Sequence, residues 1–154
     1  MWRGSALTVL DTMESLSFDH HSDDIPANLD KRFFAHAEYP RNLGRIDGAD
    51  GQATGKGVCG DSMDIYLCIR GEKIHRVGQI PHGCLYTVAS ASAVSDLCLG
   101  KRLDEALRIT PEDVAGVLGG LPEDHMHCAR LAVNTLGEAI EDYYRKIWAK
   151  TGGK

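Results

Sequence analysis

The sequence lacks any apolar run that approaches the roughly 20 residues needed to cross a bilayer. Its N-terminal stretch has a short apolar centre, but acids follow at once and there is no small-residue cleavage pattern, which argues against a signal peptide. It also lacks an excess of positive charge, because 17 Lys and Arg residues stand against 22 Asp and Glu residues and leave a net charge of −5. We therefore expect a cytoplasmic protein with neither nucleic-acid nor membrane partners.

The sequence also has no Cys-x-x-Cys pair, so it gives no support to a zinc ribbon. The number of cysteines is odd, and in a cytoplasmic chain this argues against a disulfide framework and favours metal binding, catalysis or burial. The five cysteines are Cys59, Cys68, Cys84, Cys98 and Cys128. Their positions in the predicted elements decide which of these roles each is expected to have.

The length of 154 residues and the 43% share of hydrophobic residues suit a single domain with one core. Residues 1–27 are predicted to form a flexible lead-in, because the end of this stretch is polar and aperiodic. His20 and His21 within it are interpreted as solvated rather than metal-binding. The folded domain is predicted over residues 28–148, and a flexible tail over residues 149–154.

A short helix is predicted over residues 29–39, and Pro40 ends it. Strand signals follow this helix. Alternating apolar residues over 63–69 predict a strand, and residues 73–80 predict a second strand that returns after a tight turn at Gly71-Glu72. Residues 52–58 are expected to add an edge strand. The strands together predict a small antiparallel sheet.

Helix signals follow the strands. A helix is predicted from residue 85 to its closing glycine, Gly100, and a short one over residues 102–107. Thr110 is a good N-cap for the next helix, because proline and two acids follow it. The last helix is predicted over residues 123–146. This order predicts an α+β fold, with a three-stranded antiparallel sheet covered by helices on one face.

The predicted elements sort the cysteines into two groups. Cys68 lies within a strand and Cys98 late in a helix, each among apolar residues, so both are expected in the core. Cys59, Cys84 and Cys128 lie instead at a turn or near the start of a helix. The unpaired N–H groups and positive dipole end of a helix N-terminus stabilise a thiolate, which is the metal-binding form.

Two further side chains can point toward the junction cysteines. Asp61 lies two residues after Cys59 across a glycine turn, and His127 directly precedes Cys128. Residue types and spacing leave two alternatives open: a shared metal site, or three unrelated cysteines at the ends of elements. An acid in such a turn is expected to be exposed and to contribute within about half a kcal/mol to stability.

Five segments in this order resemble the NifU/IscU family of iron–sulfur cluster assembly scaffolds. They are YPRNLG, GVCGDSMDIYL, HGC…ASAS, LDEALRITPEDV and LPEDHMHCARLAVNTL, which span roughly residues 30–146. The resemblance implies an αβββ-plus-helices fold and a carrier rather than an enzyme. It also implies a cysteine desulfurase and apo iron–sulfur acceptor proteins as partners, and a possible homodimer.

The same resemblance implies a site. Cys59, Cys84 and Cys128 would hold a transient [2Fe–2S] cluster, with Asp61 near it and His127 as an additional or alternative ligand. Thiolates hold such clusters firmly. One weaker oxygen donor, for which Asp61 is suited, would leave a replaceable corner from which the cluster can depart.

The sequence departs from the family pattern in two places. Leu85-Tyr86 follow Cys84 where the family has a small residue, and they are expected to crowd the site. The segment over residues 121–125 lacks the Leu-Pro-Pro-Val-Lys motif that a dedicated chaperone reads in bacterial housekeeping members. This segment varies in the NifU branch, which therefore fits better, in its short form.

Two zinc alternatives stand beside the scaffold hypothesis. The first is a zinc-bearing sulfur-acceptor protein that works with a cysteine desulfurase; members of that branch carry an insertion before the last cysteine and lack the His127-Cys128 pair present here. The second is a structural zinc domain, since three thiolates with Asp61 or His127 satisfy four-coordinate zinc. Iron is the expected metal, with zinc possible in the cluster-free form because zinc can occupy a vacant thiolate site.

Overall fold

The computed structural model describes residues 29–152, so the predicted lead-in with His20 and His21 lies outside the described residues. In chain order the elements are α2 (Lys31–Glu38), β1 (Gly51–Lys56), β2 (Ser62–Arg70), β3 (Lys73–His82), α3 (Leu85–Cys98), α4 (Leu103–Ala106), α5 (Pro111–Val117), a 3₁₀ turn (Glu123–His125) and α6 (Met126–Lys150). The three strands form one antiparallel sheet in the order β1-β2-β3. The predicted α+β architecture is confirmed.

The hairpin between β2 and β3 closes through the predicted two-residue turn. Gly71 and Glu72 both have positive φ angles, of 60° and 63°, as a turn that follows the twist of its strands requires. Val77 of β3 pairs with Leu67 of β2, and the register shifts between Cys68 and Ile69. This bulge lies at the end of the sheet nearest the hairpin turn.

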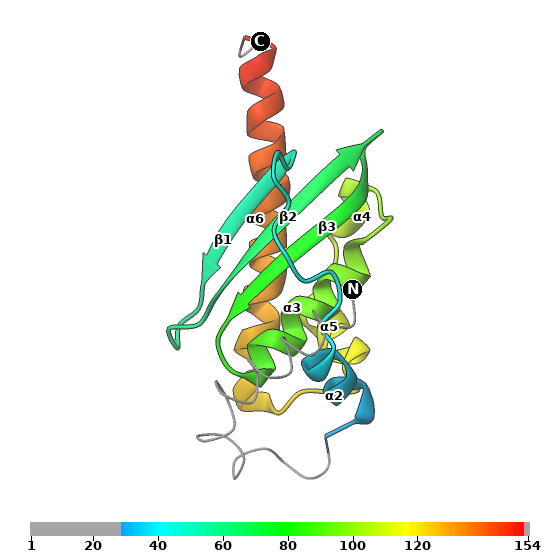
Figure 1. Ribbon diagram of the computed structural model, residues 1–154, viewed down its shortest axis with the longest axis vertical. Helices are drawn as coiled ribbons and strands as arrows, with labels where there is room; N and C mark the ends of the chain where they lie inside the picture. The colour runs from blue at the N-terminus through cyan, green and yellow to red at the C-terminus, as the bar shows by residue number, and fades with distance from the viewer. Residues whose placement is uncertain (1–28, 153–154) are drawn as a thin grey trace.

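Helices α3 and α6 lie together behind the sheet, as Figure 1 shows. The approach of α6 to β1 is close because β1 carries glycines where the helix crosses it. A Cβ atom on Gly55 would collide with the Thr135 side chain, and one on Gly51 with the Ala139 carbonyl oxygen. The backbone of β1 therefore contacts α6 directly, which fixes the helix against this edge strand.

The connection from α2 to β1 crosses the opposite face of the sheet (Figure 1). Ile46 in this segment is buried, and Gln79 of β3 donates a hydrogen bond to the Arg41 carbonyl at 2.9 Å. A Cβ atom on Gly78 would meet the Gly44 carbonyl oxygen. The sheet is therefore covered on part of both faces, with the main core on the helix side.

The helix boundaries largely follow the predicted signals. Thr110 caps α5 by accepting a hydrogen bond from the Asp113 N–H at 3.1 Å, and Asp113 accepts one from the Thr110 N–H at 2.9 Å. The predicted end of the last helix at residue 146 is wrong, because α6 runs to Lys150. An ion pair of 3.1 Å between Lys146 and Asp142, one helical turn apart, lies just before this extension.

The two cysteines expected in the core differ in their burial. Cys98 is fully buried at the end of α3, as predicted. Cys68 is only half-buried, so its assignment to the core is wrong. It follows the fully buried Leu67, and because successive strand residues point to opposite faces, Cys68 lies on the face away from the helices. Within residues 29–152, none of the helices is long and apolar enough to span a membrane.

Candidate functional site

Three junctions meet at one end of the sheet. They are the turn between β1 and β2, the connection from β3 to α3, and the start of α6, all at the same end of the molecule in Figure 1. Each of these junctions carries one of the cysteines that the sequence singled out. Side chains from all three are joined by contacts through Thr87 and Asp61.

Asp61 is enclosed at this end rather than exposed, and the expectation of an exposed turn acid is wrong. Its exposed fraction is 9%, and the Gly57 N–H donates to its backbone carbonyl at 2.7 Å. A Cβ atom on Gly57 would lie 2.5 Å from Asp61 Oδ1, and one on Gly83 would lie 2.8 Å from Asp61 Cβ. The two glycines let the surrounding backbone close over this carboxylate.

Thr87 lies at the centre of the site and was missed by the sequence analysis. Its hydroxyl donates to Asp61 Oδ2 at 3.0 Å, and its oxygen lies 3.8 Å from the Cys84 sulfur and 3.7 Å from the Cys128 sulfur. A usable signal was its spacing, because residues three apart on a helix share a face and Thr87 follows Cys84 by three. Thr87 therefore holds the carboxylate and both sulfurs around one hydroxyl.

Cys84 and Cys128 are present in different protonation states. Cys84 is the N-cap residue of α3. The hydrogen bond from the Cys128 thiol lowers the pKa of Cys84 to about 5, against the opposing effect of burial, and bonds from Thr87 and the Tyr86 N–H act in the same direction. Donating that bond raises the pKa of Cys128, and burial raises it further. The pair is one thiolate and one thiol at neutral pH.

The carboxylate adds to this concentration of anionic groups. The Cys128 thiol lies 3.9 Å from Asp61 Oδ2, within reach of both Asp61 and Cys84. Asp61 Oδ1 is buried and has no hydrogen-bond partner among residues 29–152. A buried carboxylate oxygen without a donor is costly, and a bound cation would satisfy it.

Cys59 does not take part in these contacts. It is exposed in the turn before Gly60, whose positive φ of 87° suits glycine. Its thiol makes no hydrogen bond to the part of the chain that the structure describes. The structure thus brings Cys84, Cys128 and Asp61 together and leaves Cys59 on the exposed side of the same turn.

His127 lies beside the site at the start of α6, and a second histidine accompanies it. The ligand atoms of His125, His127 and Cys128 all lie within 4.8 Å of one another. His125 ends the segment over residues 121–125, which departs from the family pattern, and it was not predicted as a ligand. Its signal was the His-x-His-Cys spacing, which places two imidazoles directly before a cysteine at a helix start.

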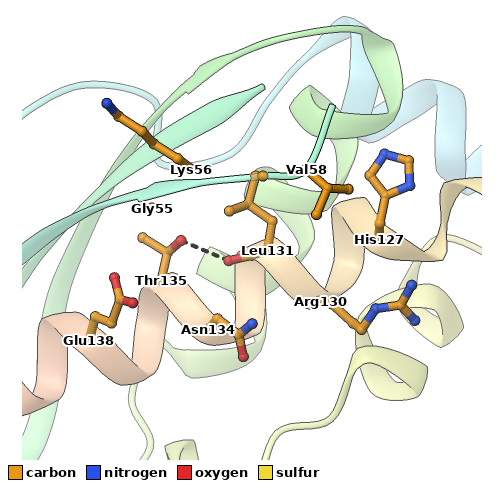
Figure 2. Close-up of a pocket in the computed structure, with 10 residues that line it drawn as sticks. Gly55, Lys56, Val58, His127, Arg130, Leu131, Asn134, Thr135 and Glu138 are labelled. Carbon is orange, nitrogen blue, oxygen red and sulfur yellow. Dashed lines mark hydrogen bonds between the residues drawn. The ribbon is translucent and has the colours of Figure 1, made fainter. Parts of the chain in front are cut away.

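A groove of about 220 Å³ runs between β1 and α6 from this corner. Figure 2 shows His127 and Arg130 at one end of it and Glu138 at the other, with Lys56 on the strand side. Val58, which is 89% exposed and precedes Cys59, also lines it. Positively charged side chains therefore lie next to the turn that carries the exposed thiol.

Leu85-Tyr86 were expected to crowd the cysteines, and the structure gives Tyr86 a further role. Tyr86 is 3% exposed and packs within the core against Phe33, with ring centroids 5.3 Å apart. Its other contact is a parallel stack on the His125 ring, with centroids 3.6 Å apart and an interplanar angle of 8°. Tyr86 therefore positions His125.

Fold and site together are those of an α+β protein that gathers thiols, a carboxylate and imidazoles at one end of its sheet. The family model of the NifU-like N terminal domain matches residues 29–150, and the chain belongs to this family. The predicted resemblance is confirmed.

Relatives agree with this assignment, and a solved structure shares the fold. The chain is 43% identical over 116 residues to the iron-sulfur cluster assembly scaffold protein IscU 1 of Archaeoglobus fulgidus, covering 75% of this chain and 76% of that protein. It is 35% identical over 113 residues to the nitrogen fixation protein NifU of Nostoc sp., covering 68% of this chain and 38% of that protein. The fold is similar to the crystal structure of a nitrogen-fixing NifU-like protein (N-terminal) from Brucella abortus, with a TM-score of 0.60 at 20% identity, over 76% of this chain and 94% of that chain.

Proposed function

We propose that this protein is a scaffold on which a [2Fe–2S] cluster is assembled transiently and from which it is transferred to apo-proteins. The observation that carries the proposal is the contact network of Cys84, Asp61 and Cys128 around Thr87. It supplies two sulfur ligands and one oxygen ligand at one enclosed point. Relatives whose names describe iron–sulfur cluster assembly scaffolds support the same function.

Cys59 supplies the third thiolate of the proposed cluster site, which comprises Cys59, Asp61, Cys84 and Cys128. Its exposed position suits the two exchanges that a scaffold must perform. Sulfur arrives from a cysteine desulfurase, and the cluster leaves to the thiols of an acceptor protein. Both events need one ligand that a partner can reach, while Cys84 and Cys128 hold the enclosed side. The protein acts in this scheme as a carrier rather than as an enzyme.

The carboxylate of Asp61 gives the proposed cluster site its lability. Thiolates hold iron–sulfur clusters firmly, whereas a carboxylate is a harder ligand that suits soft iron–sulfur centres less well. The Thr87 hydroxyl competes for Asp61 Oδ2, which further weakens the carboxylate as a ligand. His127, next to Cys128, is the additional or alternative ligand when Asp61 is displaced.

Anaerobic reconstitution with ferrous iron and sulfide tests this function. Absorption and Mössbauer spectra of the wild type are expected to show a [2Fe–2S] cluster. Cys84→Ser and Cys128→Ser should each lose it, and Cys59→Ser should lose it or hold it far more weakly. Cys68→Ser is the matched control, because Cys68 is half-buried on β2 away from these junctions. Cluster formation in Cys84→Ser equal to that in Cys68→Ser would refute the site.

One observation favours a second candidate function, that of a zinc-bearing sulfur-acceptor protein. Cys59 is exposed and makes no hydrogen bond to the enclosed pair, which suits an acceptor of persulfide sulfur. Zinc would then be held by Cys84, Asp61 and Cys128. Mass spectrometry after reaction with a cysteine desulfurase distinguishes the two: a stable persulfide on Cys59 with zinc retained and no cluster formed supports the second function.

A further inference from the structure

His125 is placed as a metal ligand would be, although neither the family resemblance nor the proposed cluster site includes it. Its ring nitrogens, those of His127 and the Cys128 sulfur supply ligand atoms that all lie within 4.8 Å of one another. All three residues come from one short stretch at the start of α6. Their spacing is therefore set by local backbone and does not depend on the position of the β1–β2 turn.

The His125 ring is held in place by a face-to-face stack. Tyr86 lies parallel to it at a centroid distance of 3.6 Å and is itself buried against Phe33. A stacked imidazole keeps both nitrogens at its edge, where they remain available for bonding. The stack removes rotational freedom that a free surface histidine would lose on binding a metal ion.

One nitrogen of His125 has an unmet need for a partner. Its Nδ1 atom is buried and has no hydrogen-bond partner within the described residues 29–152. Leaving a buried polar atom unpaired costs roughly 1–3 kcal/mol. A metal ion bound at Nδ1 satisfies this atom directly and leaves the proton on Nε2, so metal binding through Nδ1 would relieve this cost.

The separations suit a tetrahedral metal after a small adjustment. Ligand atoms at roughly 2.0–2.3 Å from a tetrahedral zinc ion lie about 3.3–3.8 Å from one another. The three atoms here are within 4.8 Å, so a shift of about 1 Å closes the set. His127 is half-buried at the mouth of the groove and can supply this shift by rotating, while the stacked His125 stays in place.

We propose that His125, His127 and Cys128 form a mononuclear site for a divalent transition-metal ion of the zinc type, here named the imidazole site. Two imidazoles and one thiolate match the ligand preference of such an ion. The fourth position is open to water or to Asp61, whose Oδ2 lies 3.9 Å from the Cys128 sulfur. The imidazole site shares Cys128 with the proposed cluster site, so one chain holds either the single ion or the cluster.

Titration with Co²⁺, a spectroscopic substitute for Zn²⁺, tests the imidazole site in a full-length Cys59→Ser/Cys84→Ser background. This background removes two thiols of the proposed cluster site and keeps all three imidazole-site ligands. We expect one Co²⁺ per chain, tetrahedral visible bands and a charge-transfer band from one thiolate. Zn²⁺ should displace the Co²⁺. Absence of Co²⁺ binding in this background would overturn the proposal.

Substitutions at His125 then assign the ligand. His125→Phe keeps an aromatic ring to stack on Tyr86 but has no ligand nitrogen, so folding is protected while the Kd for Co²⁺ rises. Loss of outer partners of a metal ligand costs about 10–100-fold in affinity, and a direct ligand should reach the upper end or beyond. His75→Ala, which removes an exposed histidine from β3, is the matched control and should keep the parent Kd. A parent Kd in His125→Phe would refute His125 as a ligand.

The titration and the cluster assay fail independently. A wild type that forms no cluster, together with Co²⁺ binding that needs His125, would refute the proposed function and leave the imidazole site standing. A wild type that forms and transfers a cluster, together with Co²⁺ binding that is indifferent to His125, would refute the imidazole site alone.

Discussion

Asp61 shows what burial does to a residue that a sequence places in a glycine turn. One carboxylate oxygen accepts a hydrogen bond from Thr87, and the other is buried without a partner among residues 29–152. The turn itself was predictable from local sequence. The enclosure was not, because it depends on Gly83, which is distant in sequence and approaches Asp61 only in the folded chain.

Asp61→Ala tests the carboxylate as the weak corner of the proposed cluster site. Without it, water or His127 occupies the open iron position, and the exit route loses a ligand that can be protonated or displaced. The half-life of transfer to an apo-ferredoxin is therefore expected to lengthen relative to the wild type. Transfer at the wild-type rate would place the source of lability elsewhere in the molecule.

Thr87→Val tests the hydroxyl that joins the carboxylate to the two sulfurs. The change keeps the shape of the side chain but leaves Asp61 Oδ2 without its closest donor, so the cluster-free protein should lose about 1–3 kcal/mol of stability. Urea unfolding measures this loss. Ser90→Ala on the same helix is the control, because the buried Ser90 hydroxyl has no partner within the described residues and its removal should cost little.

The lowered pKa of Cys84 predicts an unusual pH profile for its alkylation. With a pKa of about 5, Cys84 is already a thiolate at pH 6, so its rate with iodoacetamide should be nearly flat between pH 6 and 8. Cys128→Ala removes the main hydrogen bond that lowers this pKa, and burial then raises it. The rate at Cys84 should therefore fall at pH 6 and rise with pH in that variant. Peptide mapping resolves the labelled cysteine, and identical profiles in the two proteins would contradict the assignment.

At the scale of elements, β1 and α6 pack closely because β1 carries glycines, which have no side chain. Its glycines allow the helix backbone to approach, and the helix in turn presents Thr135 and Ala139 to the strand. Local signals predicted these elements and their neighbours, since the apolar stripe of α6, the alternation in β2 and the hairpin turn are properties of short stretches. The close fit between β1 and α6 could not be predicted, because it joins positions some 80 residues apart.

Two glycine substitutions should have opposite signs. Gly55→Ala places a Cβ atom against the Thr135 side chain and should destabilise the protein by about 1–3 kcal/mol. Gly137→Ala lies within α6 with open space around it, so the gain in helix propensity should stabilise by roughly 0.5–1 kcal/mol. Denaturant midpoints of the two variants and the wild type measure both effects. Equal and small changes would show that β1 does not rest on α6 as described.

At the scale of the whole molecule, part of the candidate site could be predicted from the sequence and part could not. The rule that thiolates favour helix starts selected Cys84 and Cys128, and the structure joins them through Thr87. It did not select Thr87 or His125, because local spacing alone does not show which side chains the fold brings together. Thr87 reaches Asp61 and Cys128 only in the folded chain, and His125 is fixed only when Tyr86 stacks on it.

The central claim is that this protein builds a cluster in order to release it. The most direct measurement follows the cluster from the anaerobically loaded protein to an apo-ferredoxin, with visible circular dichroism to distinguish donor from acceptor. The proposed function predicts that the acceptor gains a [2Fe–2S] cluster as the donor loses one, with Cys68→Ser behaving as the wild type. A cluster that forms and stays bound in the presence of excess acceptor would contradict it, as would a wild type that takes up zinc but assembles no cluster from iron and sulfide.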